Sequence, residues 1–246
     1  MQERKIDRAL RIRVRLGVIE FQVVDLLFIL CLFVFGFLIR WKLMPIESAD
    51  FWGFLEDWMN QIRESGGYRS LDHQISNYTS PYMYIMCLLS YLTENDLYGL
   101  KMVSILFDYA AAVAVFLIIH QMTGQVRKAI LGMGMLLLSP TVIIDSAYWC
   151  QCDIIYTTFI LYALYCFFKN NSKSCLIFLG VAFAFKLQTL FIVPFFLIMW
   201  LKGKTIKLRH FLWIPVVYVI SILPAWMVGR DFKELLLIYF DQSGTY

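Results

Sequence analysis

The sequence has few charged residues. Asp, Glu, Lys and Arg together make up 16% of its 246 residues, whereas hydrophobic residues make up 60% and the mean hydropathy is +0.66. Soluble domains typically contain about 25% charged and about 45–50% apolar residues. This shortage of charge, together with repeated long apolar runs, excludes an ordinary soluble domain and predicts an all-α protein that crosses a lipid bilayer several times.

The chain also lacks the patterns of several other classes of protein. Its six cysteines form no disulfide framework, and Cys31, Cys166 and Cys175 lie in or beside apolar runs, where we expect them to pack. Cys150 and Cys152 form a C-x-C pair with no second ligand pair and no histidine nearby, so we expect no metal site and no cofactor. The net charge of +4 is distributed among short loops, which gives no reason to expect a nucleic-acid partner.

Basic residues are distributed unevenly along the chain, and this predicts its orientation. The basic tail 1–22 precedes the first apolar run, and loops 124–128, 169–173 and 202–210 contain Lys and Arg but no carboxylate. Because such loops stay in the cytoplasm, we predict a cytoplasmic N-terminus. The expected external segments are a first loop, a second loop, a membrane-embedded third turn and the start of a fourth loop: 41–96, 145–153, 186–188 and 229–246.

The apolar run 174–200 decides the number of spans. As one helix its 27 residues would be about 40 Å long and would carry the basic loop 202–210 to the outside. A break at 186–188 gives two arms of about 18–20 Å, which are too short for a hydrocarbon core of ~30 Å. Since irregular backbone at that depth needs protein or a wet cavity around it, we predict seven spans around an outward-opening cavity, in one module covering residues 1–246.

The expected external loops contain amphipathic segments. Phe51, Leu55, Trp58, Met59 and Ile62 have helical spacing, which predicts a helix lying at the membrane interface. The apolar stretch 81–92 is typical of an interfacial or re-entrant helix. The last residues, from 231 onward, predict a further external amphipathic helix, after which we expect a longer protein to continue with more spans.

Three external elements can carry chemistry if this topology holds: Asp50 in the first loop, the second loop 145–153, and the broken span at 186–188. Asp50 of the first loop could act as a general base, or could cap the interfacial helix. Lys186 could offer positive charge to a phosphate, with Gln188 as a hydrogen-bond donor; alternatively Lys186 could snorkel, or pair with Asp108 or Asp145. Asp108 itself lies in the middle of an apolar run, which favours a buried helix–helix hydrogen bond. Asp25 lies near the start of its span and favours a structural role.

Several motifs resemble those of a known family: 48–51 with Trp58, Gly66-Gly67, 77–82, 145–153 and 185–188. In this order they are similar to GT-C-fold glycosyltransferases that use polyprenyl-phosphate sugars, especially bacterial relatives of the eukaryotic GPI second mannosyltransferase. The resemblance implies a seven-span module, a polyprenyl-phosphate-linked sugar as donor, inversion at the anomeric carbon, and Asp50 as the general base. Family members commonly have Gly where this chain has Cys150, and the family's variable C-terminal spans are absent from this sequence.

Further residues are expected to bind the substrates. We assign the donor phosphate to Lys186 and Gln188. The residues assigned to the rest of the substrate are Asn77, Tyr78, Trp58, Asp145, Tyr148, Trp149, Gln151 and Asp153. Tyr148 and Trp149 could also be ordinary interfacial aromatics.

The expected function is therefore transfer of a sugar, with mannose favoured by analogy, to a glycan, lipid or protein acceptor at the outer face of a bacterial cell membrane, or of the endoplasmic reticulum membrane in a eukaryote. A transporter or lipid flippase is the alternative, because intramembrane charges and broken helices also mark transport routes. Transport usually comes with a repeated half, and this sequence shows none. A non-catalytic scaffold is the third hypothesis, and it predicts that Asp50 and Lys186 are dispensable.

Overall fold

The computed structural model describes residues 10–203 and 205–242. The beginning of the expected basic tail and the last four residues of the expected fourth loop therefore lie outside the described part. Within it the protein is mostly helical, and α2 (Val23–Leu43), α5 (Asp96–Thr123) and a stretch formed by η5 (Leu208–Leu212) and α11 (Trp213–Val228) are long and apolar enough to cross a membrane. These helices support the prediction of a membrane protein.

Near the start of the described residues lies a small hairpin that the all-α prediction missed. Strands β1 (Arg13–Leu16) and β2 (Ile19–Gln22) pair antiparallel, with Arg13 opposite Gln22. Apolar and polar residues alternate in both strands, as expected for strands with one buried face. Gly17 has a φ of 62°, a conformation that tight hairpin turns require and glycine adopts without strain. The prediction of a purely helical chain is therefore wrong for this part of the tail.

The second apolar segment of the bundle is bent rather than straight. One of the seven predicted spans lies between loops 124–128 and 145–153, but α6 (Val126–Leu137) ends before α7 (Pro140–Ile143) and the π-helix η3 (Ile144–Tyr148), and the two parts meet at 50°. Ser139, before Pro140, has an extended backbone with φ −61° and ψ 125°. A proline restricts the residue before it to this region, which explains the bend. If this bent pair is counted as one span, the described residues contain four candidate spans in place of three.

The predicted break at 186–188 is confirmed. Helix α9 (Ser172–Phe185) ends at Lys186, whose backbone is extended, and the chain continues through the 3-10 helix η4 (Leu187–Ile192) into α10 (Val193–Leu201). Helix α8 (Asp153–Phe168), helix α9 and the joined stretch of η4 and α10 (Leu187–Leu201) are shorter apolar helices of 10–17 residues.

The expected first external loop folds into a compact helical unit. It contains η1 (Phe51–Leu55), α3 (Glu56–Glu64), η2 (Gly67–Asp72) and α4 (Ser80–Leu92). The apolar positions of the predicted amphipathic helix are all buried, and they join one core cluster with residues of α4. The helical spacing is thus confirmed, although the helix opens with a π-helical turn. The final helix α12 (Phe232–Gln242) is amphipathic too, because its buried residues Leu235, Ile238 and Tyr239 share one face.

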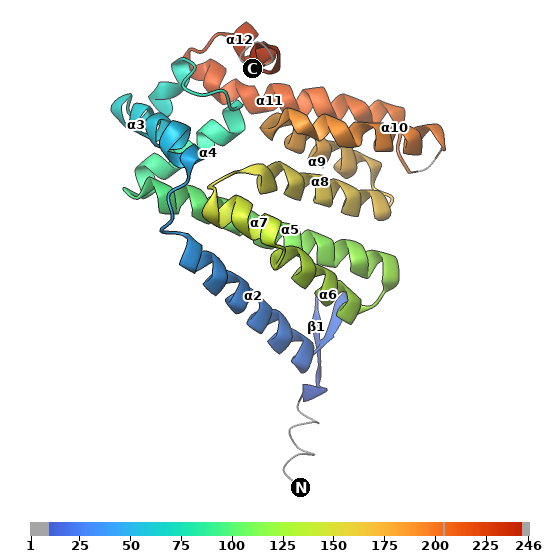
Figure 1. The fold of residues 1–246 in the computed structure, drawn as a ribbon. Helices are drawn as coiled ribbons and strands as arrows, with labels where there is room; N and C mark the ends of the chain where they lie inside the picture. The colour runs from blue at the N-terminus through green and yellow to red at the C-terminus, as the bar shows by residue number, and fades with distance from the viewer. Residues whose placement is uncertain (1–9, 204, 243–246) are drawn as a thin grey trace.

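The helices stack so that the two kinds of loop lie at opposite ends. Helix α5 packs against α6 and α8, α8 packs against α9, and α9 packs against α11. Figure 1 shows the turns after α5, α8 and α10 at one end of this stack, and α3, α4 and the start of α8 at the other. The basic loops are therefore gathered away from the carboxylate-bearing segments.

A close helix contact in this stack can be tested by mutation. A Cβ atom added at Gly180 in α9 would lie 3.0 Å from Cβ of Val217 and 3.1 Å from the Trp213 carbonyl oxygen in α11. We expect Gly180→Ala to push α9 from α11 and to destabilise the protein by about 1–3 kcal/mol, as overpacking does. The measurement is the midpoint of thermal unfolding in detergent.

Gly53→Ala is the matched control, because a Cβ atom there meets nothing within 4 Å. Equal unfolding midpoints for the two variants would contradict the close contact between α9 and α11.

Candidate functional site

Asp50 stands where the first loop begins its helical unit. Ser48, not Asp50, caps this unit: its hydroxyl accepts a hydrogen bond from the Phe51 backbone N–H (3.2 Å) and donates one to the Trp149 carbonyl (2.7 Å). Asp50 has helical backbone angles and its side chain caps nothing. The alternative that Asp50 is a helix cap is therefore wrong, and its half-buried carboxylate is directed elsewhere.

That carboxylate is held by a chain of polar side chains. The amide nitrogen Nε2 of Gln151 donates to Oδ2 of Asp50 at 2.5 Å, and the Tyr78 hydroxyl donates to Oε1 of Gln151 at 3.4 Å. Burial raises the pKa of the Tyr78 hydroxyl well above its ordinary value, and neighbouring Cys152 adds to the effect. Tyr78 therefore stays protonated and acts as a donor, which orients the Gln151 amide toward Asp50.

Lys186 lies near the Tyr78 ring and forms an ion pair. Its ammonium group forms an ion pair with Asp153, and lies 6.0 Å from the ring centroids of Tyr78 and Tyr156. We had considered Asp108 and Asp145 as partners, and the structure shows that this was wrong. Asp153 is the first residue of α8 and Lys186 follows the last residue of α9. Since the two helices pack antiparallel, these ends meet.

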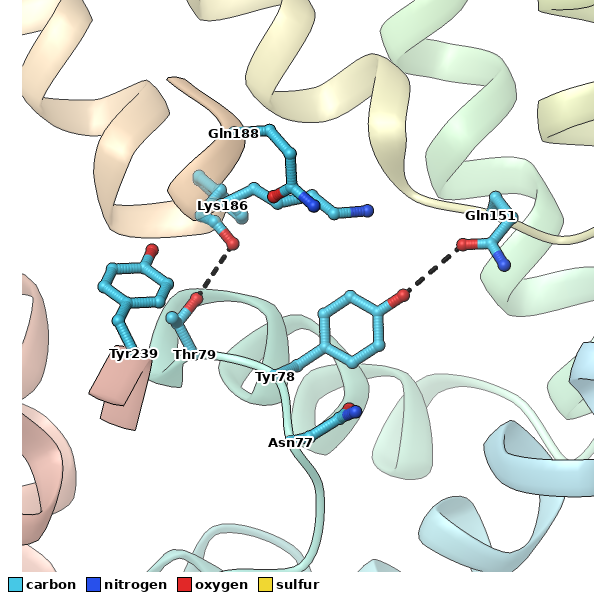
Figure 2. Close-up of a pocket in the computed structure, with 8 residues that line it drawn as sticks. Asn77, Tyr78, Thr79, Gln151, Lys186, Gln188 and Tyr239 are labelled. Carbon is cyan, nitrogen blue, oxygen red and sulfur yellow. Dashed lines mark hydrogen bonds between the residues drawn. The ribbon is translucent and has the colours of Figure 1, made fainter. Parts of the chain in front are cut away.

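Two cavities share one wall at this site. One of about 280 Å³ and one of about 170 Å³ are both lined by Asn77, Tyr78 and Gln151. Lys186 and Gln188 line the larger cavity, and Figure 2 shows Lys186 extending toward the Tyr78–Gln151 pair. The other residues of the larger cavity are Thr79, Phe185 and Tyr239, and those of the smaller one are Asp50, Phe54, Leu55 and Trp58.

The structure thus brings together many of the predicted residues but leaves others outside. The side chains of Tyr148 and Trp149 are 38% and 51% exposed and line neither of these two cavities. Asp145 is half-buried and lines neither cavity either. Asp153 lines neither cavity and contacts the site through its ion pair with Lys186.

Sequence reasoning also missed residues. Tyr239 reaches the larger cavity from α12, and its hydroxyl donates to the Phe183 carbonyl. Its helical spacing with Leu235 predicts a buried face, but nothing in the sequence shows which part of the protein that face covers. Phe54, which lines the smaller cavity, was not predicted either, because it lies outside the buried face of its helix.

The two buried aspartates of the apolar runs have structural partners. Asp108 pairs with Arg40 at 2.7 Å, and both side chains are fully buried. A buried helix–helix contact was predicted for Asp108, but Arg40, the last residue before the expected loop 41–96, was not named as its partner. Asp25 accepts a hydrogen bond from the Gln22 backbone N–H at 2.9 Å and lies 3.6 Å from Arg127. This confirms its structural role.

The C-x-C pair consists of buried free thiols. Burial raises the pKa values of Cys150 and Cys152 to about 12, so both stay protonated. Cys150 has a φ of 63°, in the region that favours glycine. Among the described residues, no three His, Cys, Asp or Glu side chains are grouped so that they could hold a metal ion.

Comparisons with family models, with curated proteins and with solved structures found no match for this chain.

The ion pair at the site predicts energetic coupling between its partners. Lys186→Met and Asp153→Asn should each lower the free energy of unfolding, and the double variant should lose less than the sum of the two single losses. We expect the difference to be only about 1 kcal/mol, because both side chains are partly exposed to solvent. Thermal unfolding of the four proteins in detergent measures this coupling.

The pair formed by Arg13 and Glu20, with side chains 75% and 58% exposed, is the matched control and should show weaker coupling. Additive effects of Lys186→Met and Asp153→Asn would mean that the ion pair does not form in solution.

Proposed function

We propose that this protein is a membrane glycosyltransferase that moves a sugar, with mannose favoured, from a polyprenyl-phosphate carrier to an acceptor hydroxyl on the extracytoplasmic side. The observation that carries the proposal is the pair of cavities with a common wall. One cavity presents the carboxylate of Asp50, the other presents the ammonium group of Lys186, and Tyr78 and Gln151 lie between them. Such a transfer needs a base on one side of the reacting carbon and charge compensation on the other.

In this mechanism Asp50 takes the proton of the acceptor hydroxyl. The hydroxyl oxygen attacks the anomeric carbon while the bond from that carbon to the phosphate oxygen breaks, which inverts the configuration. Gln151 holds one carboxylate oxygen of Asp50 and so orients it toward the smaller cavity. Trp58, which packs edge-on against Tyr78, gives that cavity an apolar wall suited to a sugar face.

The phosphate would lie in the larger cavity. A sugar linked to a lipid by a phosphodiester carries one negative charge, and the departing phosphate gains a second. A cation and donors placed where this charge develops stabilise the transition state more than the ground state. Lys186 and the exposed amide of Gln188 can fill these roles. Because Asp153 already balances Lys186, this site would favour a donor of low charge.

The same proposal includes the orientation of the chain. We propose seven spans, formed by α2, α5, the bent pair of α6 and α7, α8, α9, α10 and α11, with the N-terminus in the cytoplasm of a bacterium or of a eukaryotic cell. The separation of basic loops from carboxylate-bearing segments supports it. Helix α9 has 14 residues and so is about 21 Å long, which is consistent with Lys186 lying below the outer membrane surface.

A transporter or lipid flippase is the second candidate, favoured by the ion pair of Arg40 and Asp108, since charges inside a membrane commonly mark transport routes. Both side chains are fully buried, however, whereas the two cavities are lined by residues from loops and helix ends. The glycosyltransferase accounts for the polar cavities more directly.

The proposal predicts that Asp50→Asn abolishes transfer. In reconstituted membranes supplied with polyprenyl-phosphate mannose or glucose and mixed membrane acceptors, we expect kcat to fall about 100- to 10,000-fold, which is the usual contribution of a general base. Donor binding should be retained.

Asp57→Asn is the matched control, because Asp57 is an exposed carboxylate of the same loop that bonds Gln61. Equal turnover of Asp50→Asn and wild type would contradict the role of Asp50 and direct attention to Asp145 and Asp153. Movement of the donor across the membrane without any glycosylated product would favour transport.

A further inference from the structure

Helix α5 carries a polar face inside an otherwise apolar helix. Lys101, Ser104 and Asp108 are three and four residues apart, so they share one side of the helix over about 10 Å. Each is at most 1% exposed. Polar side chains are seldom buried this completely without a partner, and here each binds a segment that leads into the candidate site.

Lys101 fixes the point where the chain leaves α2. Its ammonium group donates to the carbonyl oxygens of Leu43 (3.3 Å), Met44 (3.2 Å) and Ile46 (2.5 Å). The last carbonyls of a helix have no partner within the helix and carry partial negative charge. A buried cation at this place therefore ends α2 and sets the direction of the first loop, four residues before Asp50.

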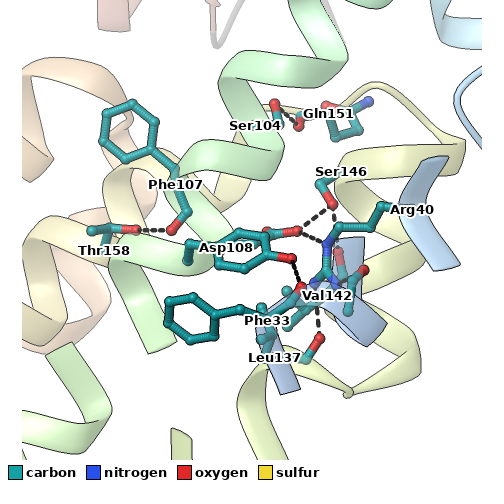
Figure 3. Close-up of polar contacts among 12 residues, drawn as sticks. Phe33, Arg40, Ser104, Phe107, Asp108, Leu137, Val142, Ser146, Gln151 and Thr158 are labelled. Atoms are coloured by element: carbon teal, nitrogen blue, oxygen red, sulfur yellow. Dashed lines mark hydrogen bonds and ion pairs between the residues drawn. The ribbon is translucent and has the colours of Figure 1, made fainter. Parts of the chain in front are cut away.

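Ser104 and Asp108 fix the second loop at both of its ends. The Ser104 hydroxyl donates to the Gln151 carbonyl at 2.7 Å, and the Ser146 hydroxyl donates to Asp108 at 2.5 Å (Figure 3). Arg40 of α2 joins the same carboxylate and donates from Nη2 to the Leu137 carbonyl at 2.9 Å. Both ends of the loop are thus attached to one helix, α5.

Asp50 and Gln151 meet where these attached segments come together. The bond from the Ser48 hydroxyl to the Trp149 carbonyl joins the two loops directly, two residues before Asp50 and two before Gln151. The backbone of Gln151 is held by Ser104, and its side chain holds Asp50.

We propose that this face of α5 positions Asp50 against Gln151, with Lys101 and Ser104 as positioning residues of the site. The proposal rests on the proposed function in so far as Asp50 acts as the base. Reactions that depend on placement lose about a hundredfold in rate for a shift of 1 Å, so loosening either attachment should slow transfer more than it weakens substrate binding.

Ser104→Ala tests the proposal, because it removes one hydroxyl and leaves the helix intact. Thr158→Val is the matched control. The Thr158 hydroxyl of α8 donates to an α5 carbonyl, that of Phe107, at 3.1 Å, but it lies outside the polar face and does not hold the second loop (Figure 3). Nitroxide labels are attached to cysteines introduced by Trp149→Cys and Leu106→Cys, both exposed positions, in a Cys31→Ser background. Electron spin resonance then measures the distance between the second loop and α5.

We expect Ser104→Ala to broaden this distance distribution and to lower kcat about tenfold or more, with KM changed less than about twofold. Thr158→Val should change neither. Unchanged distances in Ser104→Ala, or equal broadening in both variants, would overturn the attachment of the loop to α5. A broadened distribution with unchanged kcat would overturn the positioning of Asp50.

The same distance measurement separates this proposal from the proposed function. If the wild-type protein transfers no sugar, the glycosyltransferase proposal fails, and the label distances still decide whether the polar face of α5 fixes the loop. The same measurement applies to the first loop, with labels at Trp52→Cys and Leu106→Cys. There we expect Lys101→Met to broaden the distribution of distances between the labels. Unchanged distances in this pair would remove Lys101 from the positioning residues.

Discussion

The ion pair of Arg40 and Asp108 is the interaction on which the rest of the bundle depends. Burying two charges costs several kcal/mol per ion, and only well-placed hydrogen bonds offset this cost. Arg40 meets the requirement with all three of its nitrogens, which donate to Asp108, to the Gly36 carbonyl and to the Leu137 carbonyl. The pair thereby joins α2, α5 and the end of α6, and Ser146 adds the start of the second loop. A shift of any of these segments would leave a charge unpaired in an apolar interior, so their arrangement is tightly defined.

The candidate site depends on that arrangement but uses a different kind of electrostatics. Lys186 and Asp50 line the two cavities, and of these two groups only Lys186 has a direct counter-ion in the described part of the chain. Asp50 is instead held by a neutral amide, which orients the carboxylate without neutralising it. The bundle is thus joined by a buried ion pair, whereas Asp50 forms no ion pair with a cation of the described residues.

Much of the fold follows from local sequence. The apolar runs predicted the positions of the long helices, and the spacing from Phe51 to Ile62 predicted the buried face of the loop helix. The break at Lys186 followed from helix length and loop charge. Partner choice across helices did not follow, because it depends on which faces meet: Lys186 was assigned to the wrong carboxylates, Arg40 was taken for the end of a span, and Tyr239 was not expected near the site. Pro140 could have predicted the bend, but our topology used the charge of the flanking loops, which does not depend on whether a span is bent. The seven-span count stays a prediction.

The wall shared by the two cavities links binding in one cavity to binding in the other. Tyr78 and Gln151 face both spaces and are joined to each other. A molecule that rotates either side chain in one space also changes the shape of the other, so the two occupants have linked affinities. Such linkage is reciprocal by thermodynamic necessity: if the first occupant improves the fit of the second, the second retains the first to the same degree.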